Sequence, residues 1–521
     1  MTEESPVTSS PVRLDSLVSW NADWKGLRVA VLGLASTGFS VADTLAELGA
    51  DVLVVTETAT EEYARLLPVI GARLWEGSLA SVPDELLAFA PEVVVASPGF
   101  PPTHPVVAWA RDNAVPLWGD IELAWRVRDK VVRADGTPAD WVLITGTNGK
   151  TTTTRLTATM LVEGGLRAAP CGNIGVPILD AVRDPAGFDV LVVELSSHQL
   201  WYLGLNDGPG SPSPWSAVCL NLADDHLIWH GSFDAYRDAK AVVYRHVQNA
   251  CVYNKADAAT RGMVEDADVV EGARAIGFDL GTPGPSDLGI VDGILVDRAF
   301  LEERRTSALE LTTVQALAEA GLGAPHIVAN ALAAAALARS LGVEPAAIRS
   351  ALERFRLDPH RIEVVAVAQG VTWVDDSKAT NPHAAASSLA AYPGAVWVVG
   401  GQLKGVDISD LVALRGPGSR AAIVLGVERA AVVAAFARHA PEVPVFEVDH
   451  AETGTVMDRA VALAASVAQD GDVVLLAPAA ASFDQFTGYD DRGAKFAAAV
   501  RARIDGGAER EHNDDAAPEG L

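Results

Sequence analysis

Short apolar runs alternate with amphipathic stretches over the first part of the chain. Residues 29–32, 51–55 and 92–96 are rich in Val, Leu and Ala and predict buried strands. Residues 39–48 place apolar side chains at helical spacing and predict a helix between the first two strands. Apolar strands that alternate with amphipathic helices predict a parallel sheet covered on both faces.

The same alternation returns twice further along the chain, in a second block that begins near residue 120 and a third that begins near residue 358. Residues 258–312 are rich in Gly and Asp, which predicts small antiparallel strands annexed to the second sheet. An alanine-rich helix after Pro325 closes the second block. The predicted strands are 142–144, 189–194, 217–221 and 251–254 in the second block, and 372–374, 395–399, 422–425 and 472–476 in the third.

The pattern predicts an α/β protein of three domains. We expect a Rossmann-like N-terminal domain, a central P-loop ATPase-like domain with the antiparallel annex, and a Rossmann-like C-terminal domain. The polar ends of the chain predict a flexible extension and a disordered tail. The predicted boundaries are 1–26 for the extension, 27–119, 120–357 and 358–504 for the domains, and 505–521 for the tail.

Composition narrows the class of protein. The 521 residues carry a formal net charge of −28, which opposes binding to nucleic acid or to an anionic membrane. Three irregularly spaced cysteines predict a reducing compartment without a disulfide framework. Neither a signal-peptide pattern nor a membrane-spanning apolar run is present, so a cytoplasmic protein is expected. Nothing resembles a coiled coil, and we expect a monomer.

The stretch from residue 142 to residue 152 carries the clearest chemistry. An apolar strand end precedes a glycine turn, and Lys150 opens a helix, so backbone N–H groups face a phosphate. Lys150 can reach the outer phosphates of a nucleotide, and the Thr151 hydroxyl can bind Mg²⁺. Ile144 stands where the standard P-loop has glycine, so the prediction depends on the strand–turn–helix context. The predicted ATP-binding residues of this loop are Gly146, Thr147, Asn148, Gly149, Lys150, Thr151 and Thr152.

A second glycine turn, residues 33–38, follows the first predicted strand. It resembles a dinucleotide fingerprint with Ala35 in place of the middle glycine. A Cβ atom at that place crowds a pyrophosphate. The turn therefore predicts a nucleotide-binding domain but does not support a bound NAD.

Polar residues follow several strands of the second block. Glu194 ends one strand, and a carboxylate beside a phosphate loop is suited to a metal ion. Asp225 and His226 follow another strand, and Lys240 lies on the helix after them. Alone, these residues are a helix cap, a structural histidine and a solvated lysine. Together with Lys150 in the same block, they favour a single site to which all of them contribute.

The third block has its own polar strand ends. Asp376 and Lys378 are opposite charges on a loop that is suited to grip a nucleotide or a carboxylate. Arg361 lies at the junction of two blocks, where an arginine can reach a phosphate when domains close. Residues 479–486 supply Ser482 and two aromatic side chains.

Together these stretches resemble the Mur ligases of peptidoglycan precursor synthesis and the related folylpolyglutamate synthases, over residues 27–504. Residues 96–99, 119–122, 194–200 and 482–486 are most similar to the branch that adds D-glutamate. The motifs that carry the family resemblance are Thr145-Gly-Thr-Asn-Gly-Lys-Thr151, Gly172-Asn-Ile-Gly175, Glu194-Leu-Ser-Ser197, Asp225-His226, Tyr236-x-x-x-Lys240, His326-x-x-x-Asn330, His360-Arg361 and Asp376-Ser-Lys-Ala-Thr-Asn381.

The resemblance implies an ATP-dependent amide ligase. ATP would phosphorylate the carboxylate of UDP-N-acetylmuramoyl-L-alanine, and the amine of D-glutamate would displace the phosphate. The implied catalytic residues are Lys150, His226 and Lys240. Thr151 and Glu194 would hold one Mg²⁺, and His226 a second, supported by Lys240 after CO₂ has converted it into a carbamate.

The resemblance also implies the substrate contacts. Thr37 and Gly99 would bind the UDP part, Asn173 and His226 the muramoyl chain, Asn330, Arg361 and Asp376 the ATP, and Lys378, Ser482, Phe483 and Tyr489 the D-glutamate. The chain departs from the family pattern at four places: Thr56-Glu57-Thr58 replaces an Asp-Thr-Arg run, His198 replaces Phe, Ile327 replaces Asn, and Tyr489 stands where Phe is common. Uracil recognition therefore stays open.

Two alternatives to this function remain at the level of sequence. The first is another Mur-type or folylpolyglutamate-type ligase that adds a different amino acid. The second is a non-catalytic nucleotide-binding protein. The intact polar set of Lys150, Thr151, Glu194, His226 and Lys240 speaks against the second alternative.

Overall fold

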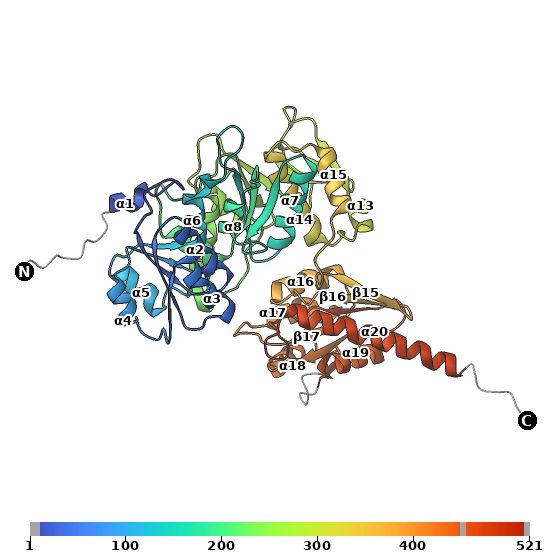
Figure 1. The fold of residues 1–521 in the computed structure, drawn as a ribbon. Helices are drawn as coiled ribbons and strands as arrows, with labels where there is room; N and C mark the ends of the chain where they lie inside the picture. Colours follow the sequence, from blue (N-terminus) through green and yellow to red (C-terminus); the bar gives the residue numbers. More distant parts are fainter. Residues whose placement is uncertain (1–10, 449–454, 515–521) are drawn as a thin grey trace, which may run out of the picture. The chain divides into compact units, whose positions relative to one another are not determined.

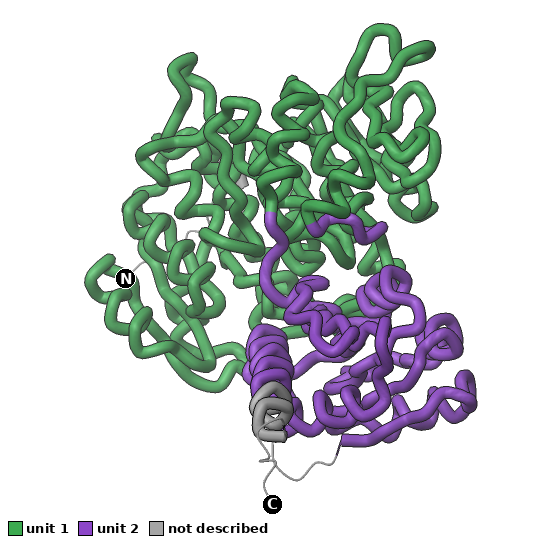
Figure 2. The backbone as a smooth tube through the Cα atoms, turned by 90° about the vertical axis from the view of Figure 1, so that its right-hand side faces the viewer, with its two compact units in different colours: residues 1–320, 327–355 green, residues 321–326, 356–521 purple. Residues whose placement is uncertain are grey.

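The computed structural model describes residues 11–448 and 455–514, with the side chains of residues 13–505 among them. It contains three sheets with helices between their strands (Figure 1). Backbone contacts divide the chain into two compact units (Figure 2). The first comprises residues 1–320 and 327–355 and holds two of the sheets, and the second comprises residues 321–326 and 356–521. The three-domain α/β class is confirmed.

The first sheet is parallel and has the strand order β3-β2-β1-β4-β5. Alternate residues of its central strands enter two separate cores, one on each face, which is why these strands are apolar throughout. β1, β2 and β4 confirm the three predicted strands, whereas the half-buried β3 and the short β5 lacked a clear apolar run. The elements are β1 Arg28–Leu32, β2 Asp51–Thr56, β3 Arg73–Glu76, β4 Val93–Ala96, β5 Leu117–Gly119, α1 Pro11–Ser16, α2 Ser36–Glu47, α3 Glu61–Ile70, α4 Asp84–Phe89, α5 Pro105–Asp112, α6 Asp120–Arg126 and the 3-10 helix η1 Arg128–Lys130.

Residues 11–26 correct the prediction of a flexible extension over residues 1–26. They begin with helix α1, and the side chains of Leu14, Leu17 and Trp24 are buried. The Trp24 ring packs edge-on against Trp118, with 6.3 Å between the ring centres. Three widely spaced apolar side chains are enough to dock a polar stretch onto a core. Residues 1–10 lie outside the described residues.

The central sheet has nine strands in the order β14-β13-β12-β11-β10-β9-β6-β8-β7. Neighbouring strands among β6 to β12 pair in parallel. The last two pairs, β12 with β13 and β13 with β14, are antiparallel. The predicted annex is therefore antiparallel only in its last three strands, and it continues the main sheet. The strands are β6 Asp140–Thr145, β7 Ala168–Gly172, β8 Val190–Glu194, β9 Ser216–Cys219, β10 Ala250–Asn254, β11 Arg274–Phe278, β12 Asp287–Val291, β13 Ile294–Asp297 and β14 Leu309–Thr313.

The helices of the central block include α7, which begins with Lys150, and α11, which carries Lys240. The alanine-rich α14 is buried along nearly its whole length. Across the described part of the chain, no helix combines the length and apolarity that membrane crossing requires. The helices are α7 Lys150–Glu163, α8 Ile178–Arg183, α9 Ser197–Gly204, α10 Leu227–His230, α11 Phe233–Ala241, η2 Val242–Tyr244, α12 Ala258–Glu265, α13 Val314–Glu319, α14 Pro325–Ser340 and α15 Pro345–Arg354.

The third sheet has the order β15-β16-β20-β17-β18-β19 and is parallel apart from the antiparallel edge strand β15. Its strands also feed two cores, one on each face. Helix α20 continues to Asp514, so residues 505–514 are helical rather than disordered, and residues 515–521 lie outside the described residues. The elements are β15 Glu363–Ala368, β16 Val371–Asp375, β17 Val396–Gly400, β18 Ala421–Leu425, β19 Val445–Glu447, β20 Val473–Leu476, α16 Pro382–Ala391, α17 Ser409–Arg415, η3 Gly416–Gly418, α18 Arg429–His439, α19 Val456–Val467 and α20 Tyr489–Asp514.

Candidate functional site

A glycine loop joins α7 to β6, which lies between β9 and β8 in the nine-stranded sheet. Gly146 and Gly149 have φ angles of +149° and +86°, which residues with a Cβ rarely adopt. A Cβ on Gly149 would lie 2.5 Å from Oδ1 of Asn330. The glycines therefore let the loop turn tightly and let Asn330 approach its backbone.

Side chains from two neighbouring segments hold this loop. The backbone N–H of Asn148 donates to Oδ1 of Asn221 at 2.9 Å, and Nδ2 of Asn221 donates to the carbonyl of Asn148 at 3.0 Å. The hydroxyl groups of Thr147 and Tyr236 lie 2.9 Å apart. Asn221 and Tyr236 were not predicted as site residues, although Tyr236 belongs to the Tyr236-x-x-x-Lys240 motif and Asn221 comes shortly after β9.

Lys150 is the first residue of α7, and its side chain folds back over the loop. Its Nζ donates to the carbonyl of Gly146 at 2.8 Å and to that of Thr147 at 2.9 Å. Thr151 and Thr152 follow it in the first helical turn. A cation and the N–H groups of a helix start thus meet at one place, which is the arrangement that binds phosphate.

Glu194 ends β8, the strand beside β6. Its Oε1 accepts a hydrogen bond of 2.8 Å from Nδ2 of Asn173, while its Oε2 is buried without a hydrogen-bond partner. The structure therefore brings together two residues that were predicted for different roles, metal binding and substrate binding. A buried carboxylate oxygen without a hydrogen-bond partner destabilises the folded protein unless a ligand binds to it.

Lys240 of α11 is almost fully buried behind the loop, with 1% of its surface exposed. Its Nζ donates to Oγ1 of Thr145 at 3.1 Å and to the carbonyl of Gly146 at 2.9 Å. No carboxylate pairs with it among the described residues. Burial, and secondarily the charge of Lys150, lowers the pKa of the Lys240 ammonium to about 7. Neutral amine is therefore accessible at this position.

His226 lies at the start of α10 in the left-handed region, with φ +53° and an exposed side chain. Its ring packs edge-on against His198, with 4.7 Å between the ring centres, and His198 stacks on Trp229 at 4.4 Å. Burial, and then the neighbouring histidines His226 and His230, lowers the pKa of His198 to about 3, so His198 is neutral. His198 thus acts here as an aromatic ring, which explains how it can replace Phe.

These central residues fit a bound Mg²⁺. The described residues supply an orphaned buried carboxylate oxygen on Glu194 and a hydroxyl on Thr151, which are oxygen ligands of the kind that Mg²⁺ takes. His226 lies on the loop after β9, at the same edge of the sheet.

The other glycine turn of this unit joins β1 to α2 and contains Thr37. Gly33 of this turn packs against Ser97 and Phe100 on the loop after β4, which also carries the exposed Gly99. Glu57 accepts a hydrogen bond of 3.1 Å from the backbone N–H of Leu79. The strand ends thus bring Thr37 and the Gly99 loop to one edge of the sheet.

The second unit places polar residues at the ends of two adjacent parallel strands, β16 and β20. The Nζ of Lys378 lies 3.5 Å from the ring centre of Tyr489, so the structure brings these two predicted residues together. Ser482 is buried and Phe483 is exposed on the loop after β20. Lys404, which sequence reasoning missed, lies with its Nζ 5.5 Å from the ring centre of Phe483.

Arg361 and Asp376 also belong to this unit. Asp376 is buried, and desolvation raises the pKa of its carboxyl group to about 6. Arg492, also missed, is fully buried and donates to the hydroxyl of Ser377 at 2.9 Å and to the carbonyl of Ala480 at 3.0 Å. It therefore ties together the two loops that carry Lys378 and Ser482.

Comparisons with known proteins agree with this geometry. The family profile of the Mur ligase middle domain matches residues 144–338, and that of the Mur ligase glutamate ligase domain matches residues 360–480. A UDP-N-acetylmuramoylalanine–D-glutamate ligase from Leifsonia xyli subsp. xyli is 62% identical over 96% of this chain and 98% of its own length. The chain belongs to the Mur ligase family.

Another relative with the same name, from Streptomyces coelicolor, is 49% identical over 92% of this chain and 99% of its own length. The solved MurF ligase of Thermotoga maritima in complex with ADP has the same fold, with a TM-score of 0.52 at 17% identity. That match covers 87% of this chain and 95% of the solved chain. Mur ligases use ATP and Mg²⁺, and this member is a ligase of peptidoglycan precursor synthesis.

Proposed function

We propose that this Mur ligase joins D-glutamate to UDP-N-acetylmuramoyl-L-alanine at the expense of ATP. The observation that carries the proposal is the 62% identity to a ligase of that name over nearly the whole of both chains. The phosphate loop with Lys150, and the strand ends beside it that bear Glu194 and His226, supply the groups that the reaction needs.

The first step makes the substrate reactive. A carboxylate oxygen of the L-alanine residue attacks the γ-phosphorus of ATP, an O–P bond forms, and ADP leaves with the electron pair of the broken bond. Lys150 and the N–H groups of the α7 start neutralise the charge of the transferred group. We assign the loop residues from Gly146 to Thr152 to this task, together with Asn330, Arg361 and Asp376.

The second step forms the amide. The neutral amine of D-glutamate attacks the acyl carbon, and phosphate leaves the tetrahedral intermediate as the amine loses a proton. We assign Lys378, Ser482, Phe483 and Tyr489 to D-glutamate. The ammonium group of Lys378 suits one of the two carboxylates of this amino acid.

Lys240 is proposed to become a carbamate. Its neutral amine attacks CO₂, a C–N bond forms and one proton leaves, so that an anion replaces an ammonium. The complete burial of the side chain and its lack of an ion pair among the described residues support this change. Bound Mg²⁺ would neutralise phosphate charge, with Thr151 and Glu194 holding one ion and His226 and the Lys240 carbamate holding a second.

The UDP part of the substrate is assigned to Thr37 and Gly99, and the muramoyl chain to Asn173 and His226. We further propose that the protein is a cytoplasmic monomer that binds neither nucleic acid nor membranes. Three buried free cysteines fit a reducing compartment, and the net charge of −28 repels polyanions.

The test is phosphate release from ATP with Mg²⁺ and UDP-N-acetylmuramoyl-L-alanine. D-glutamate, L-glutamate, L-lysine and meso-diaminopimelate are added in separate reactions. Release with D-glutamate alone is expected. Release with another amino acid would reassign the specificity of the second unit and keep the ligase chemistry. No release with any of them would refute the proposed reaction.

A further inference from the structure

Arg361 lies in a strained turn of the second unit. Its two neighbours, His360 and Ile362, have φ angles of +64° and +48°. Ile362 is β-branched, and such a residue is a genuine outlier in the left-handed region. Backbone strain of this kind persists only where the surroundings over-determine it, and it clusters at functional sites.

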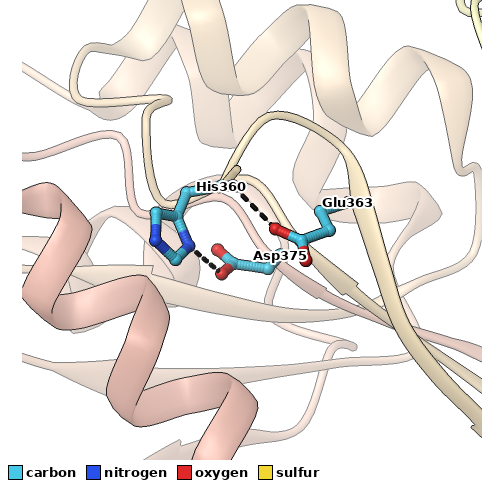
Figure 3. Close-up of side chains that lie close together, drawn as sticks. All are labelled: His360, Glu363 and Asp375. Carbon is cyan, nitrogen blue, oxygen red and sulfur yellow. Dashed lines mark hydrogen bonds and ion pairs between the residues drawn. The ribbon is translucent and has the colours of Figure 1, made fainter. Parts of the chain in front are cut away.

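Three hydrogen bonds fix His360. Its ring Nδ1 lies 2.7 Å from Oδ2 of Asp375, and its backbone N–H donates to Oε2 of Glu363 at 2.9 Å (Figure 3). Its carbonyl accepts from the backbone N–H of Lys378 at 3.2 Å. The ring, the donor and the acceptor of this one residue are thus all engaged.

The residues at the end of β16 also hold Ile362. Its backbone N–H donates to Oδ1 of the buried Asp376 at 3.3 Å, and the hydroxyl of Ser388 donates to the other oxygen of that carboxyl group. Asp375, which is fully buried, also accepts from the backbone N–H of Ser377 through Oδ1 at 2.9 Å. The two strained residues are therefore clamped by the two consecutive aspartates at the end of β16.

Helix α20 leaves room for this clamp only because residue 493 is glycine. A Cβ on Gly493 would lie 2.3 Å from Nδ1 of His360 and 2.7 Å from Oδ2 of Asp375. The helix backbone thus covers the His360–Asp375 pair directly. Packing this close restricts the imidazole to one orientation.

His360, Glu363 and Asp375 place their ligand atoms within 4.8 Å of one another, which is compatible with a metal site. The contacts argue otherwise, because the imidazole is hydrogen-bonded to Asp375 and Glu363 is occupied by a backbone N–H. Every member of the cluster already has a partner. The arrangement is therefore that of a hydrogen-bonded support.

We propose that Asp375 and Glu363 are positioning residues that act through His360 to hold the strained turn and so preset Arg361 for the nucleotide. This inference rests on the proposed function for its assignment of Arg361 to ATP. Because the carbonyl of His360 also binds the N–H of Lys378, the same clamp fixes the start of the loop assigned to D-glutamate.

The first test is Asp375→Asn, which keeps the shape of the side chain and removes its charge. We expect the KM for ATP to rise about tenfold, as misplacing a binding group by a fraction of an ångström weakens productive binding. The KM for the UDP-linked substrate should not change. Val367→Ala, an exposed position on the neighbouring strand β15, is the control and should behave like the wild type.

The second test separates positioning from stability. Ile362→Gly relieves the left-handed strain, and Ile362→Ala removes the same side chain while it keeps a Cβ. We expect the glycine variant to melt at a higher temperature than the alanine variant and yet to have the higher KM for ATP. A merely structural role would move stability and activity in the same direction.

Amide hydrogen exchange over residues 360–363 gives a readout that does not depend on the reaction. Exchange should be faster in Asp375→Asn than in the wild type. Wild-type KM values for ATP in both Asp375→Asn and Ile362→Gly, or unchanged exchange in Asp375→Asn, would overturn the inference. Failure of the proposed function would show differently, as a wild-type protein without phosphate release that depends on D-glutamate.

Discussion

The first unit contains two glycine turns of the same design, one between β1 and α2 and the other between β6 and α7. In the first, a Cβ on Gly38 would lie 2.1 Å from the carbonyl oxygen of Gly33, so glycine lets the helix start pack on the turn. In the second, Gly149 makes room for Asn330. The two turns have the same strand–turn–helix backbone, but different side chains surround them.

The difference lies in what the neighbouring strand ends deliver. Beside the first turn they bring the uncharged Ser97 and Phe100, and the carboxylate of Glu57, just after β2, already accepts a hydrogen bond from the backbone N–H of Leu79. Beside the second, β8 brings Glu194, and Lys240 reaches in from α11. A strand–turn–helix unit thus offers a place for a nucleotide, and the adjacent segments decide whether phosphate chemistry takes place there.

The sharpest way to break the comparison is Lys150→Ala. This variant leaves the second glycine turn without its cation, so that turn should no longer support phosphate transfer, as the first does not. We expect ATP-dependent phosphate release to fall about a thousandfold, as for the loss of one preorganised charge-stabilising donor. Steady-state kinetics measures the change.

A control on the same helix is Val162→Ala, which alters an exposed side chain far along α7 and should leave kcat intact. Full phosphate release by Lys150→Ala would mean that the loop does not grip ATP through this side chain.

Lys240→Ala tests the buried group behind the second turn. We expect activity to fall about a hundredfold and to recover in part when acetate or formate is added, because a small carboxylate can enter the space that the side chain leaves. Lys240→Arg fills the same space with a permanent cation and should be inactive with or without the additive. Undiminished activity of Lys240→Ala in plain buffer would remove the carbamate.

Gly38→Ala sharpens the other half of the comparison. The added Cβ collides with the backbone of Gly33, so we expect the free energy of unfolding to fall by about 1–3 kcal/mol. The KM for the UDP-linked substrate should rise, and the KM for ATP should stay unchanged. Denaturant unfolding and kinetics measure both effects.

Gly262→Ala is the matched control for this variant. It adds a methyl group to helix α12 where no atom lies within 4 Å, and it should be neutral or slightly stabilising. A Gly38→Ala protein as stable as the wild type would show that the turn can relax.

The smallest expected effect concerns the link between the two regions. Asp120 at the start of α6 accepts a hydrogen bond of 2.9 Å from Gln199, five residues after Glu194, and its other oxygen is buried without a partner. Burial raises the pKa of this carboxyl group from 3.8 to about 6. Because the folded state favours the protonated form, Asp120 destabilises the protein increasingly as the pH rises from 3.8 to 6, and by a constant amount above that.

We therefore expect Asp120→Asn to be more stable than the wild type at neutral pH, by about 1 kcal/mol once the cost of an unpartnered amide N–H is deducted. Urea unfolding at several pH values measures the difference. The advantage should shrink as the pH falls toward 4. A difference that is independent of pH would mean that Asp120 does not titrate in this range.

Much of the fold followed from the sequence because buried parallel strands must be apolar on both faces. β1, β2, β6 and β8 stand out for that reason. The edge strands β3 and β19 are only partly buried, and their short runs carry no such signal. Docking of residues 11–26 depended on three scattered apolar side chains, whose partners are distant in sequence.

The sequence by itself determined the order of the three α/β blocks, the phosphate loop and the family. These depend on local periodicity and on motifs that are contiguous in the chain. Only the tertiary structure decided that Asn221 and Tyr236 hold the phosphate loop. It also decided that Glu194 accepts a hydrogen bond from Asn173, and that two aspartates hold the turn around Arg361. Those relations join segments that are remote in sequence, and the strain and burial behind them exist only when the strands meet at one edge of a sheet.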